Sequence, residues 1–96
     1  MADVNSILTW FDAQGANEAG DRWFIQLYAK IDALEKQPQR YSVVSEFSQS
    51  GDEIREFLYG SRANKHRVIF RIHHDRVYVL RIWHRARGRL NFEDLI

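Results

Sequence analysis

The sequence from Arg67 to Leu90 reads RVIFRIHHDRVYVLRIWHRARGRL, and apolar residues alternate with arginines through most of it. Alternation with a period of two residues is typical of β-strands whose two faces differ in chemistry. The pair His74-Asp75 interrupts the alternation and suits a tight turn. The pattern therefore predicts an antiparallel hairpin, with strands over residues 66–73 and 76–83 and a basic tail over residues 84–90.

The register of this hairpin determines which side chains share a face, because directly paired residues point the same way. A two-residue turn predicts three pairs: Ile72 with Val77, Phe70 with Val79, and Val68 with Arg81. That face is expected to pack on helices. The opposite face mixes basic and apolar side chains, namely Arg67, Ile69, Arg71, His73, Arg76, Tyr78, Leu80 and Ile82. A slip of one residue would exchange the two faces.

The first part of the chain shows helical periodicity instead. Apolar residues recur three and four positions apart, which predicts helices over residues 3–14 and 18–36. Gly15 suits the left-handed residue that ends the first helix, and Pro38 ends the second. Residues 39–52 are mostly polar and are expected to form a connection, after which residues 54–59 form the first strand of the sheet.

These elements predict an α+β fold in one domain, 1–96. A short loop between two amphipathic helices favours an antiparallel helical hairpin. We expect this hairpin to pack on a small antiparallel β-sheet of about three strands. The aromatic residues of the helices are expected to belong to the core rather than to a cofactor site.

Charge is distributed unevenly along the chain. Residues 1–60 carry five Lys/Arg and ten Asp/Glu, a balance of −5, and residues 61–90 carry nine Lys/Arg and one acid, a balance of +8. Glu93 and Asp94 bring the sum to the net charge of +1. Such a split indicates an anionic partner for the basic half. The alternative is that the basic half pairs with the acidic half of the same chain.

Composition excludes several classes of function. The chain has no cysteine, so it has no disulfide, no thiolate metal ligand and no thiol nucleophile. No apolar run approaches the ~20 residues of a membrane span, and no signal peptide is visible. His73 and His74 have no acidic or thiol neighbours at metal-ligand spacing and suit a turn. We therefore expect a cytoplasmic protein with no metal ion, no cofactor and no membrane partner.

The segment IREFLYGSRANKHRVIFRIHHDRVYVLRIWHRAR, residues 54–87, together with the helical hairpin before it, resembles the RelE/ParE superfamily of bacterial toxins from type II toxin–antitoxin systems. In that superfamily the second strand of the segment carries an aromatic-Arg-apolar-apolar-aromatic pattern, which residues 66–70 match. The resemblance covers most of the chain. It implies a small toxin that is inert while bound to a cognate antitoxin, as in plasmid stabilization systems.

The superfamily contains toxins with two different targets. ParE-like members block DNA gyrase, and RelE-like members enter the ribosome and cut mRNA. The resemblance therefore implies growth inhibition by blocking gyrase or translation, with a ribosome-dependent mRNA endoribonuclease as the alternative. A third possibility is a decayed toxin that acts only as a non-catalytic interaction module.

The resemblance also implies candidate site residues. Arginines of the RNA-cutting members match Arg67 and Arg85, where cations would stabilise the charge that develops on a reacting phosphodiester. His84 would serve as general acid or base, because its ordinary pKa is close to neutrality. An ion pair with the acidic helices is the alternative role for Arg67, and a structural role is the alternative for His84. Further cations expected to bind nucleic acid or another target are Arg62, Lys65, Arg71, Arg87 and Arg89.

Three departures from the superfamily pattern refine this prediction. Its lysines are absent from residues 54–59, and its tyrosine about six residues past Arg85 is replaced by Asn91. Both changes favour a ParE-like or inactive protein. Superfamily members also begin with a strand, whereas residues 1–3 here already belong to the helical pattern. We therefore expect an uncovered sheet edge, filled by a second copy of the chain or by an antitoxin strand.

Overall fold

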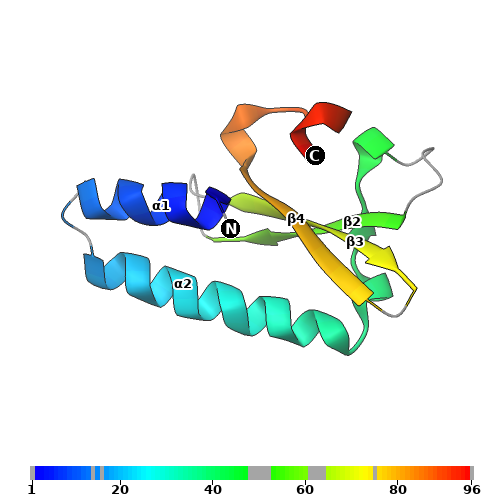
Figure 1. The fold of residues 1–96 in the computed structure, drawn as a ribbon, viewed down its shortest axis with the longest axis horizontal. Helices are drawn as coiled ribbons and strands as arrows, with labels where there is room; N and C mark the ends of the chain where they lie inside the picture. The colour runs from blue at the N-terminus through cyan, green and yellow to red at the C-terminus, as the bar shows by residue number, and fades with distance from the viewer. Residues whose placement is uncertain are drawn as a thin grey trace.

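The computed structural model describes residues 2–13, 15, 17–47, 53–60, 65–74 and 76–95. Two helices come first in the chain and the sheet follows (Figure 1). The helices and strands are α1 (Ala2–Ala13), α2 (Asn17–Asp32), β1 (Ser42–Val43), β2 (Glu53–Tyr59), β3 (His66–His73) and β4 (Arg76–His84). Short 3-10 turns connect or follow them: η1 (Ala33–Glu35), η2 (Pro38–Arg40), η3 (Ser45–Phe47), η5 (Arg85–Arg87) and η6 (Phe92–Leu95).

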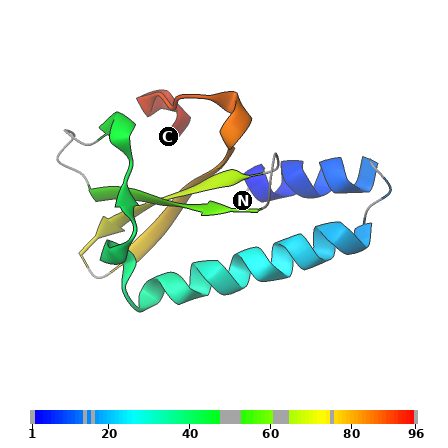
Figure 2. The same cartoon turned by 180° about the vertical axis from the view of Figure 1, so that it is seen from behind.

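The two helices form the predicted antiparallel hairpin, which Figure 2 shows from behind. Gly15 adopts a left-handed φ of 69°, and its N–H donates to the carbonyl of Asp12 at 2.9 Å, which ends α1 as expected. The second helix ends at Asp32, earlier than the predicted residue 36, because the chain tightens into η1 before it reaches Pro38. The hairpin extends past the sheet at its loop end (Figure 1).

The sheet is antiparallel throughout, with the strand order β1-β2-β3-β4. It has one strand more than predicted, because Ser42 and Val43 pair with Glu56 and Arg55. A two-residue strand among serines gives no period that could be recognised in the sequence. The bounds of β2, β3 and β4 differ from the predicted strands by one residue at most.

The register of the β3–β4 hairpin was predicted correctly near the turn and wrongly beyond it. Ile72 pairs with Val77, and Phe70 pairs with Val79. A bulge then shifts the register between Ile69 and Phe70, so Val68 faces Ile82 instead of Arg81. The shift moves Ile82 to the helix side of the sheet and moves Arg81 and Trp83 to the other side.

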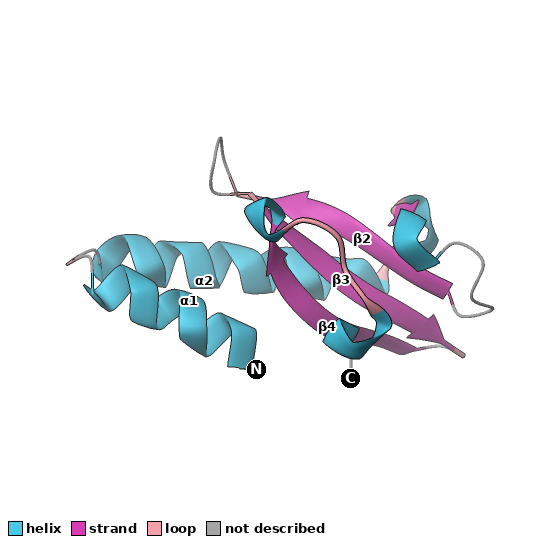
Figure 3. Ribbon diagram, turned by 90° about the horizontal axis from the view of Figure 1, so that it is seen from above, coloured by secondary structure: helices cyan, strands magenta, loops and turns pink. Residues whose placement is uncertain are grey.

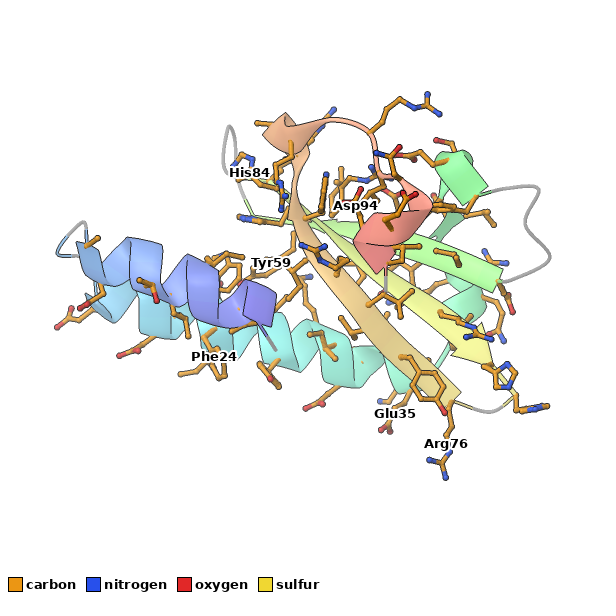
Figure 4. All side chains as sticks on the ribbon, turned by 45° about the horizontal axis from the view of Figure 1, so that its top comes forward. Phe24, Glu35, Tyr59, Arg76, His84 and Asp94 are labelled. Atoms are coloured by element: carbon orange, nitrogen blue, oxygen red, sulfur yellow. The ribbon has the colours of Figure 1, made fainter. Side chains whose placement is uncertain are left out.

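The helix side of the sheet holds the first apolar core. Its buried members come from both helices and from three strands: Val4, Leu27, Tyr59, Val68 and Ile82. The Tyr59 hydroxyl donates to the Trp23 carbonyl at 2.6 Å, so this core also contains a hydrogen bond that links β2 to α2. Figure 4 shows Tyr59 between the sheet and the hairpin.

The opposite side of the sheet holds a second apolar core, so the prediction of an open, mixed basic and apolar face was wrong for its centre. The buried members are Val44, Ile54, Ile69, Trp83 and Leu90, with Phe47 and Leu95 packed against them. The C-terminal segment supplies part of this layer, because it turns back after β4 and runs over the strands (Figure 3). At the margin of this core, the side chains of Val43 and Leu58 remain exposed.

Candidate functional site

An open groove of about 520 Å³ lies at the margin of the second core, between β1, η3, the ends of β2 and β3, and the start of the C-terminal segment. Two of its lining residues are exposed apolar side chains, Val43 and Leu58. The others are Ser42, Ser45, Glu46, Glu56, Arg67, Arg85, Gly88 and Arg89. Three guanidinium groups and two carboxylates give the groove a net charge of +1.

Arg67 is held by two carboxylates in the wall of this groove. Its Nη1 and Nη2 donate to Glu46 at 2.8 and 2.9 Å, and its Nε and Nη2 donate to Glu56 at 3.0 and 2.7 Å. The three side chains are mostly buried, with exposed fractions of 12% for Arg67, 7% for Glu46 and 19% for Glu56. Arg67 is therefore ion-paired, but to η3 and β2 rather than to the helices.

Glu46 has a further hydrogen bond, to the C-terminal segment. Its Oε2 accepts the backbone N–H of Leu90 at 3.0 Å. The hydrogen bonds from Arg67, together with that from the Leu90 N–H, lower the pKa of Glu46 to about 2, against the opposing effect of burial. The same carboxylates raise the pKa of Arg67 above its ordinary range. Glu46 and Arg67 therefore both stay ionised at neutral pH.

Arg85 and Arg89 are the accessible cations of the groove. Both are exposed, and within the described residues neither guanidinium has a hydrogen bond or an ion pair. The chain turns sharply between them at Gly88, whose φ is 82°, and the Gly88 N–H donates to the Arg85 carbonyl at 3.2 Å. The sequence predicted both residues as candidate site residues, and the fold brings them to the same groove as Arg67.

Arg87 points to a different environment, although it lies between these two residues in the sequence. Its guanidinium stacks on Trp83, 3.8 Å from the ring centroid, and Arg81 lies over the same ring at 5.0 Å. The Trp83 Nε1 donates to the Gly88 carbonyl at 3.1 Å. Cation–π contact with a buried indole explains part of the basic tail without any external anion.

His84 lies on the helix side of the sheet, away from Arg67. On the sheet it pairs with His66, and the centroids of the two rings are 4.8 Å apart. The ring of His66 also contacts that of Trp23 in α2, with 5.6 Å between the centroids. The Nδ1 of His84 accepts the Ala86 N–H at 3.0 Å and so caps η5. Figure 4 shows His84 at the end of β4. The fold therefore does not bring the three candidate catalytic residues together.

The remaining candidate cations are spread over other parts of the molecule. Arg71 lies on β3, four residues from Arg67, and its Nη2 contacts the Nδ1 of His73 at 3.3 Å near the β3–β4 turn. The carbonyl of Lys65 accepts the Arg85 N–H at 2.9 Å, which places Lys65 beside the start of the C-terminal segment. Arg62 lies outside the described residues.

Sequence reasoning missed the two acidic residues of the groove. Glu46 and Glu56 lie 21 and 11 residues before Arg67. Glu46 is in the polar connection, and Glu56 is in the first strand of the segment that carries the family resemblance, where it was given no role. A charged residue directly before the apolar residues Phe57 and Leu58 of a strand was the available signal for Glu56, since a charge that becomes buried needs a partner. Within the described residues, no group of three or more histidine or acidic side chains could hold a metal ion.

Chemically, the groove combines two accessible guanidinium groups, two serine hydroxyls and two exposed apolar side chains. Guanidinium groups bind carboxylates and phosphates, and the apolar side chains add contact area for a macromolecule. The carboxylates are bound to Arg67, and the described groove residues include no histidine. The arrangement therefore suits recognition of an anionic surface better than acid–base chemistry.

Comparison with known families agrees with the fold. Residues 1–89 match the family model described as the ParE toxin of type II toxin–antitoxin systems, parDE. The chain belongs to the ParE toxin family. No curated protein sequence and no solved structure matches it.

The α+β architecture, a helical hairpin on an antiparallel sheet, is that of a RelE/ParE-type toxin. A protein of this ParE toxin family has an antitoxin as its partner. In the described part of the chain, no helix has the length and apolar character needed to cross a bilayer.

Proposed function

We propose that this ParE-family toxin inhibits bacterial growth by binding and blocking its target, DNA gyrase or the translation machinery, in the cytoplasm. The observation that carries the proposal is the pair Arg85 and Arg89, which are exposed and unpaired among the described residues and lie on one groove with Val43 and Leu58. Such a mixed surface suits an anionic macromolecule. The cognate antitoxin neutralises the toxin by covering this groove.

The positions of the candidate catalytic residues support blocking rather than cleavage. A nuclease mechanism needs a general acid or base within hydrogen-bond reach of the reacting groups. His84 faces the helices through its contact with His66, and the charge of Arg67 is balanced by Glu46 and Glu56. The mRNA endoribonuclease is therefore the second candidate function. Expression of the toxin in bacteria distinguishes cleavage of mRNA from blocking.

The experiment is inducible expression of the full chain in bacteria, with growth as the first measurement. We expect growth to stop, and to recover partly in an Arg85→Gln/Arg89→Gln variant. Normal growth with intact protein present would refute the toxin function. Accumulation of cleaved DNA complexes would identify gyrase, and ribosome stalling without cut mRNA would identify a block of translation. Cut mRNA on ribosomes would overturn the proposal in favour of the nuclease.

We also propose that the outer edge of β4 is used for association. Within the described residues no strand pairs with that edge, and unpaired edges invite strand addition. A second copy of the chain would be the occupant in the absence of antitoxin. Light scattering over a range of concentrations tests this: we expect a dimer at high concentration, and a monomer throughout would refute it.

A further inference from the structure

The C-terminal segment that carries Arg85 and Arg89 has little regular structure, and hydrogen bonds and the buried side chain of Leu90 help to hold it on the sheet. The Arg85 N–H donates to the Lys65 carbonyl at 2.9 Å, which fixes the start of the segment. Arg81 Nη1 donates to the Asp94 carbonyl at 2.7 Å, which fixes its end. Between these anchors, Leu90 is buried in the second core.

The middle of the segment is attached to the groove through Glu46. The Leu90 N–H donates to Glu46, and Leu90 directly follows the exposed cation Arg89. Glu46 is in turn held by two hydrogen bonds from Arg67, which Glu56 holds from β2. A continuous chain of charge-assisted contacts therefore runs from the sheet to the residue next to Arg89.

We propose that Glu46 is a positioning residue of the target-binding groove: through Leu90 it fixes the segment that presents Arg85 and Arg89, and Arg67 acts through Glu46 rather than on the ligand. The activity part of this inference rests on the proposed function. The ligand class is an anionic macromolecular surface. Glu46 contributes by ordering the two cations before binding, which lowers the entropic cost of binding.

This proposal and simple electrostatics predict opposite results. Removing the charge of Glu46 raises the net charge of the groove residues from +1 to +2, which by itself would strengthen binding of an anionic partner. Positioning predicts weaker action, because the Glu46→Gln side chain presents an amide to Arg67 and loosens the attachment of Leu90. The sign of the change therefore separates the two explanations.

Limited proteolysis with trypsin measures the attachment without reference to any target. Cleavage after Arg85, Arg87 and Arg89 reports opening of the segment, and cleavage after Arg22 and Lys30 of α2 reports opening of the hairpin or global unfolding. For Glu46→Gln we expect tail cleavage to accelerate by about tenfold or more, the effect of losing one charge-assisted hydrogen bond, with a much smaller change in α2.

Two charge-matched variants serve as controls in the cleavage assay. Glu56→Gln removes a charge from the same groove but leaves the contact between Glu46 and Leu90 in place. Glu53→Gln removes a charge outside the groove, where Glu53 pairs with Arg55. We expect both to change tail cleavage by less than about threefold, well below the tenfold effect of losing the charge-assisted contact. Tail cleavage in Glu46→Gln that is unchanged, or that rises only in step with cleavage in α2, would overturn the proposal.

Growth inhibition then tests whether the attachment matters for activity. We expect Glu46→Gln to need several-fold more toxin than wild type for half-maximal inhibition. In the Arg85→Gln/Arg89→Gln background, Glu46→Gln should have no further effect, because the groups that it positions are gone. An additive loss would indicate a merely structural role, and stronger inhibition by Glu46→Gln would favour simple electrostatics. If the wild-type chain does not inhibit growth, the proposed function fails while the cleavage assay still decides the role of Glu46.

Discussion

Replacing Arg67 with methionine is the most direct test of how the groove is built. Methionine has a similar volume but no charge, so the variant leaves Glu46 and Glu56 largely buried without their cation. Removing one partner of a buried ion pair costs about 3–5 kcal/mol, because the remaining charge is uncompensated. For a small domain with an m-value of about 1.5 kcal/mol/M, this cost lowers the urea midpoint by about 2–3 M.

A second variant tests whether the uncompensated charge of the carboxylates causes the loss of stability in Arg67→Met. A triple variant, Glu46→Gln/Arg67→Met/Glu56→Gln, removes the cation and both carboxylates together. Replacing a whole buried ion network by neutral residues is often close to neutral for stability, so we expect the triple variant to regain more than half of the loss. Glu53→Gln, in the more exposed pair with Arg55, should cost less than about 1 kcal/mol.

Urea unfolding at neutral pH, followed by tryptophan fluorescence, gives all these free energies. A loss below about 1 kcal/mol for Arg67→Met would show that the network behaves as a surface ion pair, contrary to the reasoning from burial. A triple variant as unstable as Arg67→Met would show that lost packing, and not unpaired charge, causes the effect. Either result would also weaken the case for Arg67 as the support of Glu46.

Three further predictions concern pH and packing. The pKa of Glu46 is lowered from 4.5 to about 2, so the ionised carboxylate contributes about 3 kcal/mol to the free energy of unfolding. This contribution is fully present above pH ~5 and is lost as the pH falls toward 2. Urea unfolding across this pH range should show this loss of stability in wild type and not in Glu46→Gln. Tyr59→Phe removes the hydroxyl that donates to the Trp23 carbonyl. Thermal unfolding should show a loss of about 1 kcal/mol, which lowers the melting temperature by several degrees. Trypsin cleavage of the C-terminal segment should not change. Leu90→Ala should lower the free energy of unfolding by about 2–5 kcal/mol, because Leu90 is 3% exposed in the second core. In this variant, amide hydrogen exchange should be fastest in residues 85–95. A loss of stability under about 1 kcal/mol would mean that the segment is not packed as described.

The candidate site was only partly predictable. The density of arginine after β4 indicated an anion-binding segment, and Arg85 and Arg89 do lie exposed on one groove. Nothing in the local pattern distinguished them from Arg87, which stacks on Trp83. The difference arises from the turn at Gly88 and from the place of the indole ring, and both depend on how the segment folds back on the sheet.

The local patterns of the sequence were enough to determine the hairpin of helices, the three long strands and the family, because helix and strand periods are set by residues a few positions apart. The tertiary structure alone decided which face each residue beyond the bulge occupies, since one extra residue in β4 reverses the alternation. It also decided the role of Arg67, whose partner Glu46 lies 21 residues away, and that of Glu46, whose partner Leu90 lies 44 residues away. Such contacts depend on the packing of distant segments, so no local period in the sequence records them.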